Sequence, residues 1–431
     1  NNTMNNITNE KHNNSALFYG WKVVFTLLLI NTMVSGLSFY NHAIIINALS
    51  RLPQFTVQSV SLAVSLFFLS GGITGLWVAK LLRDYDPRWC ICAGAVVAAL
   101  ALSALGLVQD LWQLYILYCL FGMGFCASGL VPATTLVTRW FHRRRALALS
   151  VSSTGLSLGG VLITPLCAVL VESKGLLFAG PMMGLLYLFG VVPAALLWLR
   201  PSPESMGLAP DGDSPGAASA VTATAVTALS GAGEEPDSEY SAVIKGRLFW
   251  AISVAYIFLM LAQVGGIAHQ FGIARELLSE TQTVLAVAIL PVASILGRLV
   301  GGWLIDQLSI RLFALAMMLL QSLSLGLLSL GSGIGTLYLG LALFGITVGN
   351  LLMLQPLLIA QAFGVSAYPR LFALSNLLSS LGTAAGPALL GVVYGFSGQH
   401  YGAAYAVAAA AGLIGMALFW AGGEIGRVRP K

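Results

Sequence analysis

The feature that most constrains this chain is a series of long apolar runs along its whole length. Twelve such runs, each of roughly 20–27 residues, are separated by short polar segments. Runs of this length favour membrane-spanning helices over a β-barrel, whose strands are about half as long. The composition agrees, since 57% of the residues are hydrophobic and 9% are charged, against about 25% charged in typical soluble domains. The sequence therefore predicts an all-α membrane protein.

The predicted spans fall into two sets of six. They are 22–48, 56–80, 89–108, 112–138, 145–171 and 177–199, followed by 248–272, 281–305, 311–330, 336–363, 370–395 and 400–422. The segment between the sets is rich in Pro, Ser, Ala, Gly and acidic residues, which is typical of a linker. We expect a disordered tail over 1–16, a six-helix bundle over 17–199, a cytoplasmic linker over 200–247, a second six-helix bundle over 248–422 and a cytoplasmic tail over 423–431.

The positive charges predict an orientation. If both termini lie in the cytoplasm, seventeen of the 21 Lys and Arg residues lie on the cytoplasmic side, and Arg51, Lys174 and Arg275 lie outside. The remaining one, Arg298, falls within the membrane. Because cytoplasmic loops of membrane proteins carry an excess of Lys and Arg, we expect a multi-pass protein of the inner (plasma) membrane with both termini cytoplasmic.

Arg298 lies inside the eighth run, "LPVASILGRLVGGWLID" (290–306). It is eight residues, or ~12 Å along a helix, from Asp306, and a side chain cannot reach the surface from there. All sixteen acidic residues fall in loops, tails or helix ends, so none is available at mid-membrane to neutralise it. An unpaired intramembrane charge marks a functional site by default. Since a guanidinium binds a carboxylate through two parallel hydrogen bonds, we predict that Arg298 holds a small organic acid.

Two loops carry related charge patterns. "GLWVAKLLRDYDPRW" (75–89) follows the second span and "GGWLIDQLSIR" (301–311) follows the eighth; each has glycine, a hydrophobic stretch, an acid and then an arginine. Such an acid can cap a nearby helix N-terminus and pair with basic neighbours, which would latch the two halves on one side. The predicted latch residues are Asp84, Arg88, Asp306 and Arg311.

With this pair of loops the chain resembles the major facilitator superfamily. Four further stretches narrow the resemblance to the monocarboxylate transporter family, particularly its bacterial members near the oxalate/formate exchangers. They are "FYGWKVV" (18–24), "RWFHRRRALALSVSSTGLSLGG" (139–160), "GIAHQFGIARELL" (266–278) and "LGTAAGPALLGVVYGFSGQHYGAAY" (381–405). The resemblance implies two six-helix bundles that rock about a central site and expose it to one side at a time. It also implies a carboxylate-binding arginine in helix eight, which is Arg298 here.

The resemblance also has departures. In the first loop the family has Asp followed by Arg, whereas here Arg83 precedes Asp84. The family's animal members couple transport to a proton through an aspartate where this chain has Ser294, and they use a lysine in helix one where this chain has only His42 nearby. Helix eleven, "LFALSNLLSSLGTAAG" (371–386), lacks the second basic residue of dicarboxylate-exchanging relatives, which favours a monoanion over oxalate.

Other polar residues within the apolar runs are candidates for the same site. Ser294 lies one helical turn before Arg298 on the same face. His269 and His42 can titrate near neutral pH and are the candidates for proton coupling; the alternative for His269 is a histidine bonded to backbone at an extracellular gate. We predict substrate contacts for Ser294, His269, Asn350, Tyr118 and Asn41 beside Arg298, with interhelical hydrogen bonds or helix packing as the alternative for the last three.

The sequence thus predicts a secondary active transporter that moves a small monocarboxylate such as lactate or pyruvate by alternating access, with or without a proton. The alternatives are an anion exchanger of the oxalate/formate type, an exporter of other small molecules, or a transport-derived sensor acting through 200–247. No phosphate-binding loop, metal-ligand pattern or catalytic triad appears in the sequence. We therefore expect no enzyme activity, no cofactor and no nucleic-acid partner. The expected partners are an organic anion, a proton or counter-anion and the lipid bilayer, with the monomer as the working unit.

Overall fold

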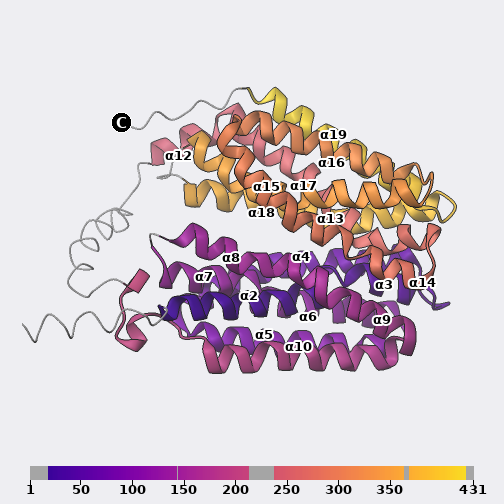
Figure 1. Ribbon diagram of the computed structural model, residues 1–431, viewed down its shortest axis with the longest axis horizontal. Coiled ribbons are helices and arrows are strands. Elements are labelled where there is room, and N and C mark those ends of the chain that lie inside the picture. Colours follow the sequence, from indigo (N-terminus) through magenta and orange to yellow (C-terminus); the bar gives the residue numbers. More distant parts are fainter. Residues whose placement is uncertain (1–17, 143, 213–236, 364–367, 424–431) are drawn as a thin grey trace, which may run out of the picture.

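The computed structural model describes residues 18–142, 144–212, 237–363 and 368–423 as helices packed side by side (Figure 1). Twelve helical segments are long and apolar enough to cross a membrane, and the described residues contain no β-strand. The predicted all-α fold with twelve spans is therefore confirmed. The observed spans begin and end within about five residues of the predicted limits.

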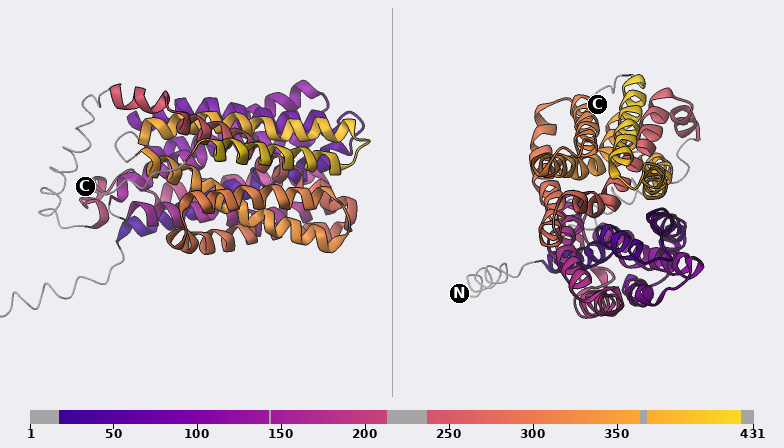
Figure 2. Two further views of the ribbon diagram at one scale, coloured as in Figure 1. Left: turned by 90° about the horizontal axis from the view of Figure 1, so that it is seen from above. Right: turned by 90° about the vertical axis from the view of Figure 1, so that its right-hand side faces the viewer.

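The first six spans form one half of the molecule. Its helices are α2 (Tyr19–Leu37), α3 (His42–Ser50), α4 (Val57–Asp84), α5 (Pro87–Ala104), η1 (Leu105–Leu107), α6 (Leu111–Ser128), α7 (Leu130–Trp140), α8 (Arg145–Leu158), η2 (Gly159–Ile163), α9 (Thr164–Lys174) and α10 (Leu176–Trp198). The second half comprises α13 (Arg247–Leu277), α14 (Glu280–Ala286), α15 (Ile289–Gln307), α16 (Ile310–Ser329), α17 (Ile334–Phe363), α18 (Tyr368–Phe396) and α19 (Tyr401–Ala421). Figure 1 shows the halves side by side, indigo to magenta and orange to yellow, and Figure 2 shows the same division from two further sides.

The predicted linker carries local structure at both of its ends. Two 3-10 turns, Glu204–Met206 and Pro210–Gly212, follow α10, and the short helix α12 (Asp237–Ile244) precedes α13. Residues 213–236 lie outside the described residues, as do the predicted tail 1–16 and residues 424–431. We call the end of the molecule where α10 ends and α13 begins the linker end, and the opposite end, where α3 ends and α14 begins, the far end (Figure 1).

The main contacts between the halves involve five pairs of helical segments, one of which is η2 with α15. The other four are α4 with α18, α3 with α13, α8 with α15, and α9 with α14. In the first pair, the polar contacts join the beginning of α4 to the last third of α18, and both of these segments lie toward the far end. The described contacts therefore bring the halves together at the far end and at mid-depth.

Several spans are interrupted where the sequence predicted continuous helices. The first span breaks at residues 38–41, the fourth at Gly129 and the eighth at 287–288, while the fifth contains the π-helix η2. Broken and π-helical segments are frequent at functional sites, because they release or redirect side chains from a regular helix. Two of these interruptions, at 38–41 and at η2, lie beside the residues that surround Arg298.

Close packing of α2 against the fifth span fixes this arrangement. Gly36 and Gly159 face each other, and a Cβ added to Gly159 would lie 2.5 Å from the backbone nitrogen of Gly36. No side chain fits there, so the two backbones meet directly. The hydroxyl of Ser35 donates to the carbonyl of Leu156 (2.7 Å). The side-chain amide of Asn31 donates to the carbonyl of Ser152 (3.0 Å). These bonds hold the end of α8 in a defined rotation.

Candidate functional site

Arg298 is a charged residue near the middle of the molecule. It is the central residue of α15, nine residues from either end of that helix, and it is half-buried. Its Nη2 atom donates to the hydroxyl of Ser157 on α8, 3.4 Å away in the other half, while its buried Nε atom has no partner among the described residues. No described carboxylate forms an ion pair with Arg298. The guanidinium thus keeps donors available for an anion.

Three hydroxyl groups gather beside this guanidinium. The Oγ atoms of Ser157 and Ser294 lie 3.3 Å apart across the junction between the halves, and both serines are buried. Tyr40, in the break between α2 and α3, lies close to Ser157 and within electrostatic reach of Arg298. Arg298 and Ser294, which were predicted to be neighbours, therefore share one site. Tyr40 and Ser157 of the first half also belong to it, although they were not among the predicted site residues.

The positions of Tyr40 and Ser157 depend on the packing of η2. A Cβ on Gly160 would lie 2.7 Å from the Cβ of Pro291 on α15 and 2.9 Å from the ring of Tyr40. Glycine at this position therefore lets η2, α15 and the break after α2 approach one another closely. Ser157 lies within the stretch "RWFHRRRALALSVSSTGLSLGG" that carries the family resemblance, but nothing in the sequence shows which of its four serines faces α15.

Asn350 lies beside the same helix but is engaged by backbone. Its Nδ2 atom donates to the carbonyl of Gly297 (2.9 Å) on α15 and to that of Ile346 (2.8 Å) on its own helix, α17. Its buried Oδ1 atom has no described partner, and a Cβ on Gly301 would collide with it. Asn350 thus ties α15 to α17 at the level of Arg298, and its amide nitrogen has both hydrogens committed.

Two candidates of the first half, His42 and Tyr118, lie in a buried aromatic cluster, and the third, Asn41, has partners of its own. His42 is fully buried among Phe67 (ring centroids 4.3 Å apart), Phe68 (5.6 Å) and Tyr118 (5.8 Å), and neither of its ring nitrogens has a described partner. The hydroxyl of Tyr118 is also buried without one. Asn41 donates to the carbonyl of Leu37 (3.1 Å) and to a methionine sulfur on α10 (3.3 Å). None of the three shows a described contact with Arg298.

At the far end, α4 and α18 are joined by polar contacts. The backbone N–H of Ala388 donates to the Oγ of Ser65 (2.9 Å), and the side-chain amide of Gln58 donates to the carbonyl of Val392 (3.3 Å). A Cβ on Gly391 would collide with the side chain of Ser61. We call this contact region the far-end gate; it comprises Gln58, Ser61 and Ser65 of α4, residues 387–395 of α18 and His269 of α13.

His269 lies within this gate rather than beside Arg298. It is buried, and its Nε2 atom is 3.0 Å from the carbonyl of Pro387 and 3.4 Å from the hydroxyl of Ser61. Its Nδ1 atom is 3.4 Å from the hydroxyl of Tyr401 on α19. Of the two interpretations open from the sequence, this geometry matches a histidine bonded to backbone at a gate.

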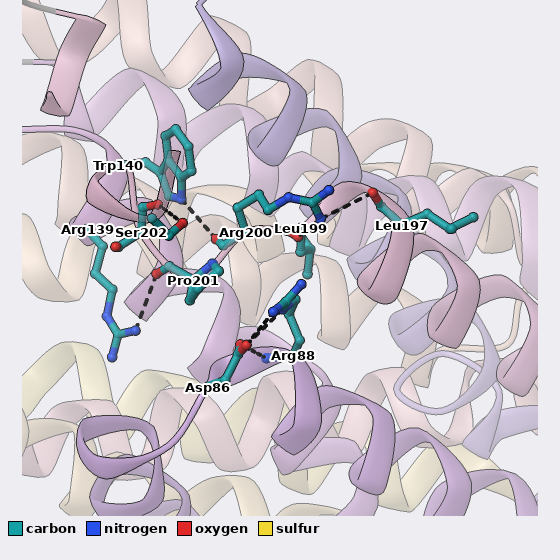
Figure 3. Close-up of polar contacts among 10 residues, drawn as sticks. Asp86, Arg88, Arg139, Trp140, Leu197, Leu199, Arg200, Pro201 and Ser202 are labelled. Carbon is teal, nitrogen blue, oxygen red and sulfur yellow. Dashed lines mark hydrogen bonds and ion pairs between the residues drawn. The ribbon is translucent and has the colours of Figure 1, made fainter. Parts of the chain in front are cut away.

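The first predicted latch has a different acidic partner from the expected one. Arg88 donates from Nε (2.9 Å) and Nη2 (2.7 Å) to the Oδ2 of Asp86, and Figure 3 shows the two side chains directed toward each other. Asp84 is exposed and has no described ion pair. Asp86 is also the N-cap of α5, where it accepts the backbone N–H of Arg88 (3.0 Å), and Pro87 occupies the first helical position. The run Asp-Pro-Arg at 86–88 is the signal that could have identified Asp86, instead of Asp84, as the partner of Arg88.

Asp86 lies in a positively charged corner at the linker end. Burial raises the pKa of its carboxyl, but the hydrogen bonds and charge of Arg88 and the charge of Arg139 outweigh burial and hold this pKa below its usual value. Arg139 donates to the carbonyls of Leu82 and Pro201, and the indole of Trp140 donates to the carbonyl of Arg200 (3.1 Å; Figure 3). These bonds fasten the end of α4 and the start of the linker to α7.

The second predicted latch is only partly described. The side chain of Asp306 lies outside the described residues. Arg311 donates from Nη2 to the carbonyl of Trp420 (3.0 Å) in the last turn of α19, where a cation also faces the negative end of the helix dipole. Among the described residues, no group of three or more His, Cys, Asp and Glu side chains is arranged to bind a metal ion.

Comparison with known proteins decides the family. The model of the Major Facilitator Superfamily matches residues 28–273 and 251–429, which is nearly the whole chain. The chain belongs to the Major Facilitator Superfamily. Together with its twelve candidate spans, this makes it a multi-pass membrane protein of that superfamily, and the narrower monocarboxylate resemblance stays a prediction.

The relatives of this chain are diverse. It is 31% identical over 117 residues to an "MFS-type transporter" of Gibberella moniliformis, covering 27% of this chain and 28% of that one. It is 27% identical over 200 residues to "MFS-type transporter pynF" of Aspergillus niger (43% of each chain), and 21% identical over 279 residues to a "Probable hexose phosphate transport protein" of Chlamydia muridarum (59% and 58%). The chain thus matches less than two thirds of the length of each of these relatives.

Solved structures share the fold of this chain. A bacterial homolog of the human lysosomal transporter Spinster, in an inward-facing and occupied conformation, has a TM-score of 0.68 at 16% identity, covering 97% of this chain and 100% of that one. A peptide transporter POT mutant in complex with sulfate has a TM-score of 0.69 at 17% identity, covering 93% and 94%. At such identities the likeness concerns the fold alone.

Proposed function

We propose that this protein is a secondary active transporter that carries a small monocarboxylate, of the lactate or pyruvate kind, and that Arg298 binds the carboxylate. The single observation that supports this proposal most is the state of Arg298. It is a cation at the centre of a membrane helix, it has no described acidic partner, and its buried Nε atom is unpaired. A monoanion would supply the missing charge and accept two parallel hydrogen bonds.

The position of the site supports alternating access. Arg298 and Ser294 belong to the second half, whereas Ser157 and Tyr40 belong to the first. An anion bound here would lie between the two halves, so its binding would depend on how the halves are oriented. The halves are joined at the far-end gate, and we infer that this conformation exposes the site toward the linker end.

The proposed location and orientation of the protein in the membrane rest on its charges. We place the transporter in the inner (plasma) membrane with both termini cytoplasmic, because seventeen of the 21 Lys and Arg residues then lie on the cytoplasmic side. The far end would then face outward. The name of the Chlamydia muridarum relative describes an anionic substrate, a hexose phosphate, which is consistent with an anion-binding cation in this chain.

Uptake into liposomes tests the proposal. We expect radiolabelled lactate, pyruvate or formate to enter liposomes that contain the protein, and an inward proton gradient to accelerate entry if a proton is cotransported. Because hydrogen bonds to a charged group contribute about 1.5–3 kcal/mol, Arg298→Gln should lower kcat/KM by about 10- to 150-fold, and Arg298→Lys should not restore it. Lys174→Gln, which removes an exposed cation at the far end, is the matched control and should transport normally.

Other results would select the alternatives. Uptake that requires liposomes preloaded with another anion would identify an exchanger. Normal carboxylate transport by Arg298→Gln would contradict the role of Arg298, and transport of bulky apolar compounds by that variant would indicate an exporter.

A further inference from the structure

His269 joins both halves of the far-end gate. It lies on α13 of the second half, seven residues before Glu276, and its ring contacts Ser61 on α4 of the first half. The same ring contacts the carbonyl of Pro387 on α18 and the hydroxyl of Tyr401 on α19. Four helices therefore meet at one imidazole, and its contact with Ser61, which crosses between the halves, depends on a closed gate.

The contacts define the protonation state of this ring. A carbonyl oxygen only accepts, so the Nε2 atom of His269, 3.0 Å from the carbonyl of Pro387, must carry a hydrogen and donate it. Nδ1 is then the acceptor in the neutral ring, and the hydroxyl of Tyr401 donates to it over 3.4 Å. The closed gate is thus complementary to neutral His269 with the hydrogen on Nε2.

A second proton would bind at Nδ1, whose described partner, the hydroxyl of Tyr401, is a donor to the neutral ring. The hydroxyl of Tyr401 would have to turn its hydrogen away, and a cation would be buried in a contact made of serine, glycine and aromatic groups. Around the ring, the packed elements carry these titratable and charged groups: Tyr401 and Tyr405 on α19, His400 before α19, Tyr394 on α18, Glu276 and Arg275 on α13, and Glu280 on α14, which pairs with Arg275. On α3, His42 is enclosed by its own aromatic cluster and Arg51 pairs with Glu172; on α4, the first charged residue is Lys80, at the opposite end of the helix.

Protons have a short path to this ring from the far end. A cavity of about 590 Å³ at the far end is lined by residues that include Glu276, His400 and Tyr401. Glu276 accepts the backbone N–H of Tyr401 (2.9 Å) and lies 3.9 Å from the Nδ1 of His400. Tyr401 therefore forms the wall between this cavity and Nδ1 of His269.

We propose that His269 is a pH-sensitive latch of the far-end gate. Neutral His269 holds the gate closed, and a proton that reaches Nδ1 from the far side favours the state in which α4 and α18 have separated. In the open gate, water solvates the imidazolium, which the closed gate cannot do. The inference rests on the alternating access of the proposed function, but not on the identity of the substrate.

A distance measurement between labels on the two halves tests the latch. Spin labels on Leu52 and Phe396, both exposed at the far end, report gate opening in the full chain with its five native cysteines replaced, reconstituted in lipid nanodiscs. With equal pH on both sides, we expect the distance distribution to shift from short to long as the pH falls through the range of about 5 to 7. His269→Gln should keep the short distance throughout, because glutamine can donate and accept similar bonds but does not titrate.

Two further variants separate the latch from a merely structural role. Tyr401→Phe removes the donor to Nδ1 and so the partner of the neutral ring, and the midpoint of opening should move to higher pH. His400→Gln removes the exposed histidine of the cavity (80% exposed side chain) and should leave the midpoint unchanged.

Each contrary result has a distinct meaning. A pH response retained in His269→Gln, or lost in His400→Gln, would overturn the latch and assign the response to another group. Labels that move on addition of saturating lactate but not with pH would overturn the latch alone. Labels that never move would overturn the alternation on which both proposals rest.

Discussion

The Nη2 atom of Arg298 and the Oγ atom of Ser157 lie 3.4 Å apart, although the two residues belong to α15 and α8 in opposite halves. A cation at the centre of one half is thus held by a neutral hydroxyl of the other. Such a contact is long for a hydrogen bond and cannot neutralise the charge. It leaves the guanidinium able to exchange this partner for a carboxylate.

The first prediction concerns this contact. If a bound carboxylate displaces Ser157 from the guanidinium, Ser157→Ala removes a competitor and should lower the KM for the transported acid about 2- to 5-fold, the equivalent of about 0.5–1 kcal/mol. The measurement is the concentration dependence of uptake into liposomes. Ser153→Ala, one turn earlier on α8, is the control, because its hydroxyl bonds the carbonyl of Ser150 within the same helix. A raised KM in Ser157→Ala would instead show that Ser157 contacts the substrate.

The second prediction concerns closure of the far-end gate. Gly391 lies against Ser61, and no Cβ fits between α18 and α4 at this point. Gly391→Leu should therefore hold the helices apart, abolish transport and leave the far end permanently open. Thiol labelling of a cysteine introduced at Ser61 would show this opening as increased reactivity. Gly326→Leu on α16, where a Cβ meets open space, should transport normally. A closed far-end gate in Gly391→Leu would contradict this prediction.

The third prediction concerns the acid at the linker end. Asp86→Ala removes the N-cap of α5 and the partner of Arg88, so it should lower the free energy of unfolding by about 1 kcal/mol at neutral pH. Asp84→Ala should have little effect, because Asp84 is exposed and has no described ion pair. Thermal unfolding in detergent measures both. Equal destabilisation by the two substitutions would restore Asp84 as the structural acid of this loop.

The same pair gives a pH dependence. The folded-state pKa of Asp86 is held below its usual value by Arg88 and Arg139, so its ionised form stabilises the fold. This contribution is complete above the unfolded value of about 3.9 and is lost as the pH falls through the lower folded pKa. The difference in melting temperature between the native chain and Asp86→Asn should therefore shrink below about pH 4. A difference that grows on acidification would have the wrong sign for this mechanism.

The fourth prediction concerns the tie between α15 and α17. Gly301→Ala would push a methyl group against the Oδ1 of Asn350, whose amide holds the carbonyl of Gly297. Each of Gly301→Ala and Asn350→Ala should destabilise the protein by about 1 kcal/mol. The double variant should lose less than the sum, because the smaller alanine at 350 makes room for the new methyl group. Additive losses of melting temperature would show that the two positions do not interact.

The site was only partly predictable from the sequence. Arg298 could be found because a charge within an apolar run is visible without any structure, and Ser294 followed from helical periodicity. Tyr40 and Ser157 were missed, because a break after α2 and a π-helix after α8 determine where they lie. Asp86 was overlooked in favour of Asp84, two residues away, since a simple charge pattern does not show which acid starts a helix.

Local properties of the sequence determined the twelve spans, the division into two sets of six and the unpaired charge of Arg298. Hydrophobic length and the absence of a nearby acid are properties of one segment at a time, and the membrane acts on each segment separately. Only the tertiary structure decided that His269 lies in the far-end gate and that Ser157 faces Arg298. These relations depend on how far each helix is rotated and where it breaks, and packing between segments more than a hundred residues apart sets both.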